Sequence, residues 1–220
     1  MFTQSTTLPG FDPSLGIWFH VKTPRPDHPR PGLFLDRDGV IVEDPGYLSR
    51  VHDVAFIPGA ASLIAEANRR KIPVVEITNQ AGIARGYFGW DAFQAIEEHV
   101  TEQLAGQGAA LDAVLACPYH PDGIAPWNHP DHPARKPRPG MLLAAGRLLH
   151  LDLKRSWIVG DKLDDLQAGH AAGLRGGLHV LTGHGAAHRP AVLSWDHPDF
   201  DLRLGDTITV AAQLLDLLTP

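Results

Sequence analysis

Leu33-Phe-Leu-Asp-Arg-Asp-Gly-Val-Ile-Val-Glu-Asp44 is the stretch from which the rest of the chain is best understood. It begins as a short apolar run, which is typical of a buried strand in a parallel sheet. Two carboxylates follow, Asp36 and Asp38, and Gly39 closes the motif. Ligands of open α/β sheets bind outside the carboxyl ends of the strands. The stretch therefore predicts a charged site at such an edge.

The spacing of the two acids indicates what such a site can do. Neighbouring carboxylates repel one another, so they need a cation, a partner or a shared proton. Mg²⁺ fits, because it takes oxygen ligands and is commonly held by one or two carboxylates plus substrate phosphate. One carboxylate can then attack phosphorus, while the second acts as a general acid and base. The alternative is a strand followed by an ordinary Asp-Gly turn.

Composition limits the class of protein. The chain has 220 residues, 44% hydrophobic and 20% charged, which is typical of a globular domain with a buried core. A net charge of -6 argues against nucleic acid or anionic membrane as a partner. The single cysteine, Cys117, excludes an internal disulfide and fits a reducing compartment. With no membrane-length apolar stretch and no signal peptide, we expect a cytoplasmic monomer or small homo-oligomer.

Strand and helix patterns alternate along the chain. This alternation predicts right-handed crossovers and an α/β fold built on a parallel sheet. Strands are expected from residue 33 and at 72–79, 111–116, 156–160 and 177–182, and helices at 58–71, 91–104, 141–150 and, closing the chain, 207–218.

Two segments fall outside this alternation. Residues 1–32 form a Pro-rich N-terminal extension before a domain of residues 33–220. Its apolar side chains are expected to dock on the body of the protein, with a partner-binding arm as the alternative; they are Leu15, Ile17, Trp18 and Phe19. Residues 117–134 form a loop of unusual length, which indicates function or an insertion.

Polar residues also follow the other predicted strands. Thr78 and Asn79 precede a Gly-containing loop, 80–86, that can cradle a phosphate or simply cap a helix. Asp161 follows a later strand, and would complete an all-oxygen metal site with Asp36 and Asp38. Asp165 adds a further carboxylate one helical turn on.

Cations gather before the helix expected at 141–150. Although the chain as a whole is acidic, the four-residue stretch 135–138 contains three cations, Arg135, Lys136 and Arg138. Because a helix N-terminus itself favours anions, this placement indicates an anion site rather than a solvated basic turn.

The four motifs, in this order, resemble the haloacid dehalogenase superfamily. They are Asp36-x-Asp38-Gly39, Thr78-Asn79-Gln80, Lys136 and Gly160-Asp161-x-x-x-Asp165. Longer matches are similar to the D-glycero-D-manno-heptose 1,7-bisphosphate phosphatases and the related histidinol-phosphate phosphatases. These matches are Leu35-Asp-Arg-Asp-Gly-Val, Thr78-Asn-Gln-Ala-Gly-Ile-Ala-Arg-Gly, Arg135-Lys-Pro-x-Pro-Gly-Met and Val159-Gly-Asp-Lys-Leu-x-Asp.

The resemblance implies a three-layer Rossmann-like sheet with a minimal cap domain or none. It implies that Asp36 is the nucleophile and a Mg²⁺ ligand, and that Asp38 is the general acid/base and binds Mg²⁺ through its carbonyl. Asp161 would be the third ligand, and Thr78 and Lys136 would stabilise the phosphoryl group. The implied substrate-binding residues are Asp44, Pro45, Gly46, Tyr47, Thr78, Asn79, Gln80, Ala81, Arg135 and Lys162.

One departure concerns zinc. Zinc-bearing members of this family have four Cys or His ligands where this chain has Cys117, Tyr119, His132 and Ala134. Structural zinc usually needs four ligands, so the usual site is expected to be absent. A rearranged site is the alternative, because the loop also contains His120 and His129.

The combined motifs predict a Mg²⁺-dependent phosphatase that acts on a small phosphorylated sugar through an aspartyl-phosphate. Heptose bisphosphate is the expected substrate, and histidinol phosphate or another small phosphomonoester is the alternative. A protein that only binds a phosphorylated ligand is less consistent with the sequence, since nucleophile, acid/base, phosphate cation and metal acid are all present.

Overall fold

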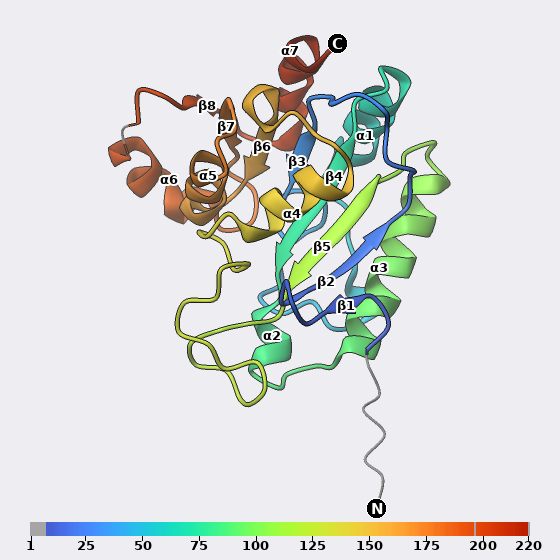
Figure 1. The fold of residues 1–220 in the computed structure, drawn as a ribbon, viewed down its shortest axis with the longest axis vertical. Helices are drawn as coiled ribbons and strands as arrows, with labels where there is room; N and C mark the ends of the chain where they lie inside the picture. Colours follow the sequence, from blue (N-terminus) through green and yellow to red (C-terminus); the bar gives the residue numbers. More distant parts are fainter. Residues whose placement is uncertain (1–7, 196, 220) are drawn as a thin grey trace, which may run out of the picture.

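A single eight-stranded sheet forms the centre of the molecule in a computed structural model that describes residues 8–195 and 197–219. The strand order is β1-β2-β5-β4-β3-β6-β7-β8 (Figure 1). From β5 to β8 each strand runs parallel to its neighbour, whereas β1 and β2 are antiparallel additions at one edge. The strands are β1 (Phe11–Asp12), β2 (Ile17–Val21), β3 (Leu33–Leu35), β4 (Val74–Asn79), β5 (Ala113–Cys117), β6 (Trp157–Gly160), β7 (Gly176–His179) and β8 (Asp201–Leu204).

Helices cover both faces of the sheet (Figure 1). One apolar core lies under α1 (Ala60–Arg69) and α3 (Trp90–Ala105), and it extends to the C-terminal helices. The other lies under α4 (Gly140–Leu148), α5 (Leu163–Ala171) and α6 (Gly185–Ser194). The predicted three-layer α/β class is therefore confirmed. No helix in the described part of the chain is both long and apolar enough to cross a membrane.

The position of β3 explains where the site lies. Its three residues are fully buried, because both faces of the strand are covered by helices. The chain passes from β3 to β4 and β5 on one side, and then continues with β6, β7 and β8 on the other. Such a reversal of strand order leaves a crevice at the carboxyl end of the central strand. Asp36 follows β3 at that point.

The N-terminal segment is part of the sheet. Ile17 and Trp18 are buried, which confirms that this segment docks on the body of the protein. The sequence analysis did not predict that β2 pairs with β5 and so covers an edge whose backbone groups would otherwise be unpaired. The first seven residues of the extension 1–32 lie outside the described residues.

The C-terminal prediction was wrong in its helix type. Instead of one α-helix over 207–218, a 3₁₀ helix, η3 (Ile208–Leu214), precedes the short α7 (Leu215–Leu218). The buried residues of η3 are Ile208, Ala211 and Leu214. This spacing of three places them on one face of a 3₁₀ helix.

Strand β7 ends at His179, earlier than predicted. The remaining elements are three short helices or turns. The loop expected at 80–86 contains the short α2 (Ala81–Ala84), and two 3₁₀ turns are η1 (Val51–Asp53) and η2 (Leu153–Arg155). The long segment between β5 and α4 contains no named helix or strand within the described residues.

Candidate active site

A cavity of about 280 Å³ opens at the carboxyl ends of the parallel strands. Asp36 follows β3, Asn79 ends β4 and Asp161 follows β6. These residues are far apart in the sequence but lie at one edge of the sheet, because parallel strands end at the same edge. Asp161 is not itself a lining residue of the cavity. The cavity is lined by Asp36, Arg37, Asp38, Asp44, Gly46, Tyr47, Leu48, Asn79, Gln80, Ala81, Gly82, Phe88, His120, Arg135, Lys136, Lys162, Asp164, Asp165 and His184.

Lys136 is the buried cation of this site. Its Nζ lies 2.9 Å from Asp36 Oδ1 and 2.6 Å from Asp165 Oδ1, and it donates a hydrogen bond to the carbonyl of Ile77 at 3.0 Å. The Asn79 side chain donates to the Lys136 carbonyl and accepts from its N–H. Burial acts to lower the pKa of Lys136, but Asp165 and Asp36 raise it above its usual value. The lysine is therefore fixed in place and charged.

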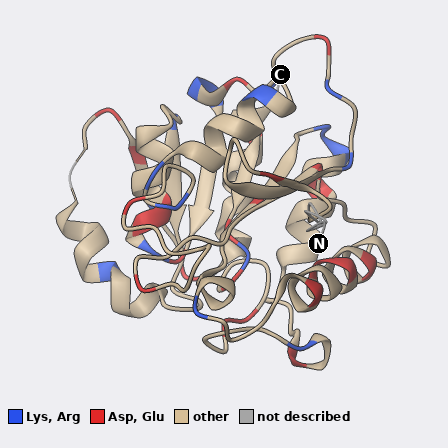
Figure 2. Ribbon diagram, turned by 60° about the horizontal axis from the view of Figure 1, so that its bottom comes forward, with Lys and Arg blue, Asp and Glu red and all other residues tan. Residues whose placement is uncertain are grey.

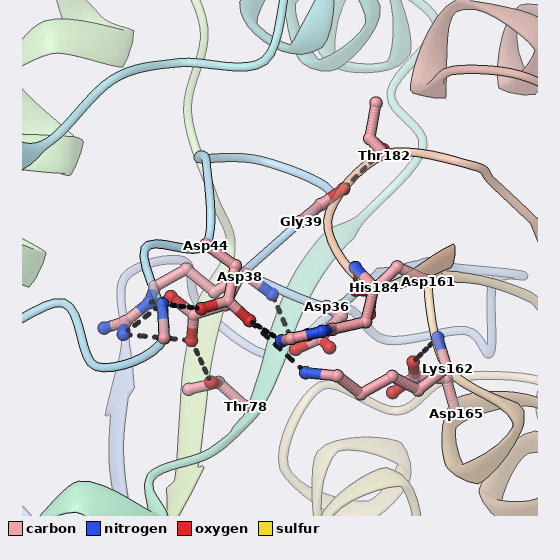
Figure 3. A network of polar contacts seen from close by, with 12 residues as sticks. Asp36, Asp38, Gly39, Asp44, Thr78, Asp161, Lys162, Asp165, Thr182 and His184 are labelled. Carbon is pink, nitrogen blue, oxygen red and sulfur yellow. Dashed lines mark hydrogen bonds and ion pairs between the residues drawn. The ribbon is translucent and has the colours of Figure 1, made fainter. Parts of the chain in front are cut away.

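Three buried carboxylates lie together beside Lys136. One oxygen of each of Asp36, Asp161 and Asp165 lies within 4.8 Å of the others (Figure 3). Asp161 Oδ2 accepts a hydrogen bond from the His184 N–H at 2.7 Å, whereas Asp161 Oδ1 is buried without a hydrogen-bond partner among the described residues. An all-oxygen set with an unpaired buried oxygen fits a hard divalent cation.

The electrostatics of this cluster also favour a cation. Burial raises the pKa of Asp36 to about 6, although Lys136 acts in the opposite direction. Burial and the neighbouring carboxylates raise the pKa of Asp161 to about 8. A bound cation would offset this cost of burying negative charge. The cluster can therefore hold a metal ion.

Asp38 lies apart from the acidic cluster. Its carboxylate accepts hydrogen bonds from Arg37 at 3.0 and 3.1 Å, from Gln80 at 3.1 Å and from the Thr78 hydroxyl at 3.4 Å (Figure 3). The Thr78 hydroxyl in turn accepts from Gln80 at 2.8 Å. The two acids of the motif thus have different surroundings, which allows them different chemical roles.

Most of the predicted substrate-binding residues line the cavity. Pro45 and Thr78 are not among the lining residues, and Thr78 instead points to Asp38. Its role as a phosphoryl contact stays a prediction.

Sequence reasoning did not identify Phe88, Asp164 or His184 as part of the cavity. His184 Nε2 lies 3.1 Å from Asp44 Oδ2, and Lys162 Nζ lies 3.4 Å from the same oxygen. The signal for His184 was present in Thr182-Gly-His184, where polar residues flank a glycine at the end of a strand.

At the four positions where the family resemblance implies zinc ligands, the side chains are stacked or buried. The rings of Tyr119 and His132 are stacked, with centroids 3.8 Å apart and planes at 6°. Cys117 and Ala134 are buried, and burial raises the pKa of the Cys117 thiol to about 12. Gly16 packs against His132, so the loop rests on the N-terminal hairpin.

The three loop histidines form hydrogen bonds with the backbone of the same loop. His120, His129 and His132 each accept a backbone N–H at Nδ1, from Asp122, Asp131 and Ala134. Among the residues that the structure describes, Cys117 and these histidines form no group of three ligands close enough to share an ion.

Comparisons with known proteins agree on the family. A HAD-hydrolase-like family model matches residues 133–202. D-glycero-beta-D-manno-heptose-1,7-bisphosphate 7-phosphatase of Mesorhizobium japonicum is 53% identical over 166 residues, which cover 75% of this chain and 76% of that protein. The Escherichia coli K12 protein of the same name is 40% identical, over 70% of this chain and 80% of its own length.

Two crystal structures extend the similarity to the whole fold. A HAD-like phosphatase from Mesorhizobium loti has a TM-score of 0.80 and 44% identity, over 93% of this chain and 94% of that one. D,D-heptose 1,7-bisphosphate phosphatase from B. bronchiseptica, complexed with magnesium and phosphate, has a TM-score of 0.73 and 32% identity, over 84% of this chain and 97% of that one.

Proposed function

Because the chain belongs to the haloacid dehalogenase-like phosphatases, in the family of the D-glycero-beta-D-manno-heptose-1,7-bisphosphate 7-phosphatases, we propose that it removes one phosphate from a heptose bisphosphate. The observation that carries this proposal is the contact between the Asp36 carboxylate and the buried ammonium of Lys136 at the cavity. In this proposal Asp36 is the nucleophile, and the contact supports that role because phosphoryl transfer requires a fixed positive charge beside the reacting group.

We propose Mg²⁺ as the metal of the acidic cluster, in keeping with the magnesium of the B. bronchiseptica structure. Asp36 and Asp161 would hold it, with Asp165 beside them and the Asp38 carbonyl as a further ligand. When bound, the ion would neutralise charge that develops on the phosphoryl oxygens.

In the first step an Asp36 oxygen forms a bond to phosphorus while the ester P–O bond breaks. Asp38 gives its proton to the leaving sugar oxygen, and Asp36 becomes an aspartyl-phosphate. Lys136 supports the negative charge of the transferring group from within the protein.

In the second step water attacks phosphorus and the bond between phosphorus and Asp36 breaks. Asp38, now ionised, takes a proton from the water, so inorganic phosphate leaves and both aspartates return to their starting forms. The hydrogen bonds from Arg37 and Gln80 suit an Asp38 side chain that must carry a negative charge in this step.

The cavity walls support a substrate with two anionic groups. Lys136 would stabilise the charge of the phosphate that is transferred. Arg135 and Lys162 supply further positive charge on the cavity walls. Asp44 and Asp164 add carboxylates that can accept hydrogen bonds from sugar hydroxyls. This mixture of cations and acceptors suits a phosphorylated sugar better than an apolar ester.

Phosphate release tests the proposal. Both anomers of heptose 1,7-bisphosphate, histidinol phosphate and simple phosphomonoesters would be assayed with Mg²⁺ and with EDTA. We expect Mg²⁺-dependent release, fastest with one heptose anomer, and loss of turnover in folded Asp36→Asn. Asp53→Asn is the matched control, because Asp53 lies in the η1 turn and is not a lining residue of the cavity.

Two outcomes would contradict the proposal. Full turnover in Asp36→Asn would exclude this nucleophile. Failure of the wild-type protein to release phosphate from any ester would favour a protein that only binds a phosphorylated ligand. Faster release from histidinol phosphate would preserve the reaction and change the substrate.

A further inference from the structure

A chain of buried ion pairs connects α3 to Asp38. The Arg37 guanidinium lies 2.7 Å from Glu97 Oε1 and contacts both oxygens of Asp38, at 3.0 and 3.1 Å. The side chains of Arg37 and Glu97 are only 1% and 5% exposed. Arg37 therefore lies between one carboxylate of the cavity and one carboxylate of a helix outside it.

The placement of Glu97 differs from that of the other acids of α3. The helix has four acidic residues, Asp91, Glu97, Glu98 and Glu102 (Figure 2). Three of them are exposed, whereas Glu97 is buried on the same side of the helix as Phe93. The Arg37 guanidinium also lies over the Phe93 ring, 5.5 Å from its centroid. One face of α3 thus holds Arg37 through both a charge and an aromatic ring.

A second buried acid is near but cannot replace Glu97. Burial and the nearby Glu97 raise the pKa of Glu76 well above its usual range, which disfavours a negative charge on Glu76. Both Glu76 oxygens lack a hydrogen-bond partner among the described residues. Glu97 and Asp38 are therefore the two carboxylates that hold the Arg37 side chain.

Stability alone does not explain such a network. Replacing a buried ion pair with apolar groups is often neutral or stabilising, because desolvation costs about as much as the pair gains. What this network supplies is orientation, since a guanidinium held from two sides binds a carboxylate in one geometry.

We propose that Glu97 is a positioning residue that acts through Arg37 to aim the Asp38 carboxylate at the leaving-group oxygen. The inference rests on the proposed function, in which Asp38 is the general acid. Without Glu97, the guanidinium loses its charged partner on α3 and keeps only the Phe93 ring, so Asp38 loses a firmly held donor. The reaction step that needs a proton from Asp38 is then the step that suffers.

The need for that proton depends on the ester. A p-nitrophenolate leaves without protonation, whereas an alkoxide does not. The value of kcat/KM reports the steps up to phosphoryl transfer to Asp36, so a misplaced acid lowers it for alkyl esters and spares p-nitrophenyl phosphate. A merely structural defect lowers both values together.

The experiment compares β-glycerophosphate, phenyl phosphate and p-nitrophenyl phosphate as substrates of the full chain with Mg²⁺. For Glu97→Ala we expect kcat/KM to fall by roughly 10- to 100-fold on β-glycerophosphate and by less than about 3-fold on p-nitrophenyl phosphate, with phenyl phosphate between them. Glu97→Gln keeps the side-chain volume and is measured in the same way if Glu97→Ala does not fold. Glu102→Ala, an exposed acid of the same helix, is the matched control.

The outcomes separate the two proposals. Equal losses on all three esters, or no loss, would overturn the positioning role of Glu97 and leave the phosphatase intact. If Asp38→Asn itself showed no greater loss on the alkyl ester, the role of Asp38 in the proposed function would be wrong. A wild-type protein that was inactive on these esters and also on both anomers of heptose 1,7-bisphosphate would overturn the proposed function as a whole.

Discussion

Lys136 Nζ lies 2.9 Å from Asp36 Oδ1, in a position where both side chains are almost completely removed from solvent. The contact joins the loop before α4 to the end of the central strand. It also places Lys136 between Asp36 and Asp165, two carboxylates that would otherwise repel one another.

Replacing this lysine is therefore expected to affect both stability and catalysis. Lys136→Met leaves two buried carboxylates without their cation, which should cost about 3 to 5 kcal/mol of unfolding free energy in EDTA. It should also lower kcat by about 10²- to 10³-fold with Mg²⁺, because a fixed positive charge is lost at the phosphoryl group. Urea unfolding and steady-state kinetics measure the two effects. Lys154→Met, at an exposed position, is the control, and an unchanged unfolding free energy in Lys136→Met would contradict the assigned ion pairs.

The stability of the metal-free protein should fall as the pH rises above 6.5. Asp161 has a pKa of about 8 in the fold, against about 3.9 in an unfolded chain. The folded state therefore binds more protons than the unfolded state up to pH 8, so the unfolding free energy decreases with pH. His179, whose pKa is lowered by burial to about 4, acts in the opposite direction only below about 6.5.

The pH effect is measured by urea unfolding in EDTA at pH 6.5 and 8.5. We expect a loss of roughly 1 to 2 kcal/mol, which Mg²⁺ should reverse because it favours the ionised carboxylates. Asp161→Asn should reduce the loss. A rise in stability over this range in EDTA would show that the acidic cluster does not hold these protons.

The carboxyl edge of the sheet was predictable because its signals are local. Asp36 and Asp161 each directly follow an apolar strand, so the topology alone brings them together. The stacking of Tyr119 on His132 and the contact between Arg37 and Glu97 were not predictable, because each depends on side chains that only the tertiary structure brings together.

Two elements that the sequence did not predict, β2 and the 3₁₀ helix η3, also depend on tertiary contacts. β2 lies between Pro-rich segments and is stabilised by pairing with β5, which its own sequence does not reveal. In the tail, apolar residues recur at a spacing that fits either a short amphipathic α-helix or the 3₁₀ helix η3. The sequence pattern therefore does not distinguish the two, and tertiary packing determines which one forms.

A methyl group at Gly183 should disturb the metal site. Gly183 has φ +58°, and an added Cβ would lie 2.4 Å from Asp161 Oδ2 and 2.6 Å from Gly39 Cα. Gly183→Ala should therefore displace the Asp161 carboxylate and weaken Mg²⁺ binding by about 10-fold or more. Calorimetric titration with Mg²⁺ measures this directly.

The control for this prediction is Gly108→Ala. Gly108 has a similar φ of +72°, with nothing within 4 Å of an added Cβ. Both variants should lose about 1 to 2 kcal/mol through backbone strain, but only Gly183→Ala should lose Mg²⁺ affinity. Equal affinities in the two variants would mean that Gly183 does not shape the site.

The loop 117–134 should keep its structure without zinc. Tyr119 and His132 stack at two positions where the family resemblance implies zinc ligands. Trp127 contacts Tyr119 and Phe11 through aromatic rings 5.5 and 5.2 Å away. We expect elemental analysis of the purified protein to find much less than one zinc per chain, and we expect a zinc-selective chelator to leave the melting temperature unchanged.

The Cys117 thiol provides an independent test of the same prediction. Cys117 is fully buried, and burial raises the pKa of its thiol to about 12. Because a reagent cannot reach the thiol in the folded state, the protein should react at pH 8 only as fast as it unfolds. Urea should expose the Cys117 thiol to the reagent. Added zinc should neither slow the reaction of the thiol nor stabilise the folded protein. One tightly bound zinc per chain, together with a fall in melting temperature on chelation, would show that a rearranged site exists. Its candidate ligands would then be Cys117, His120, His129 and His132.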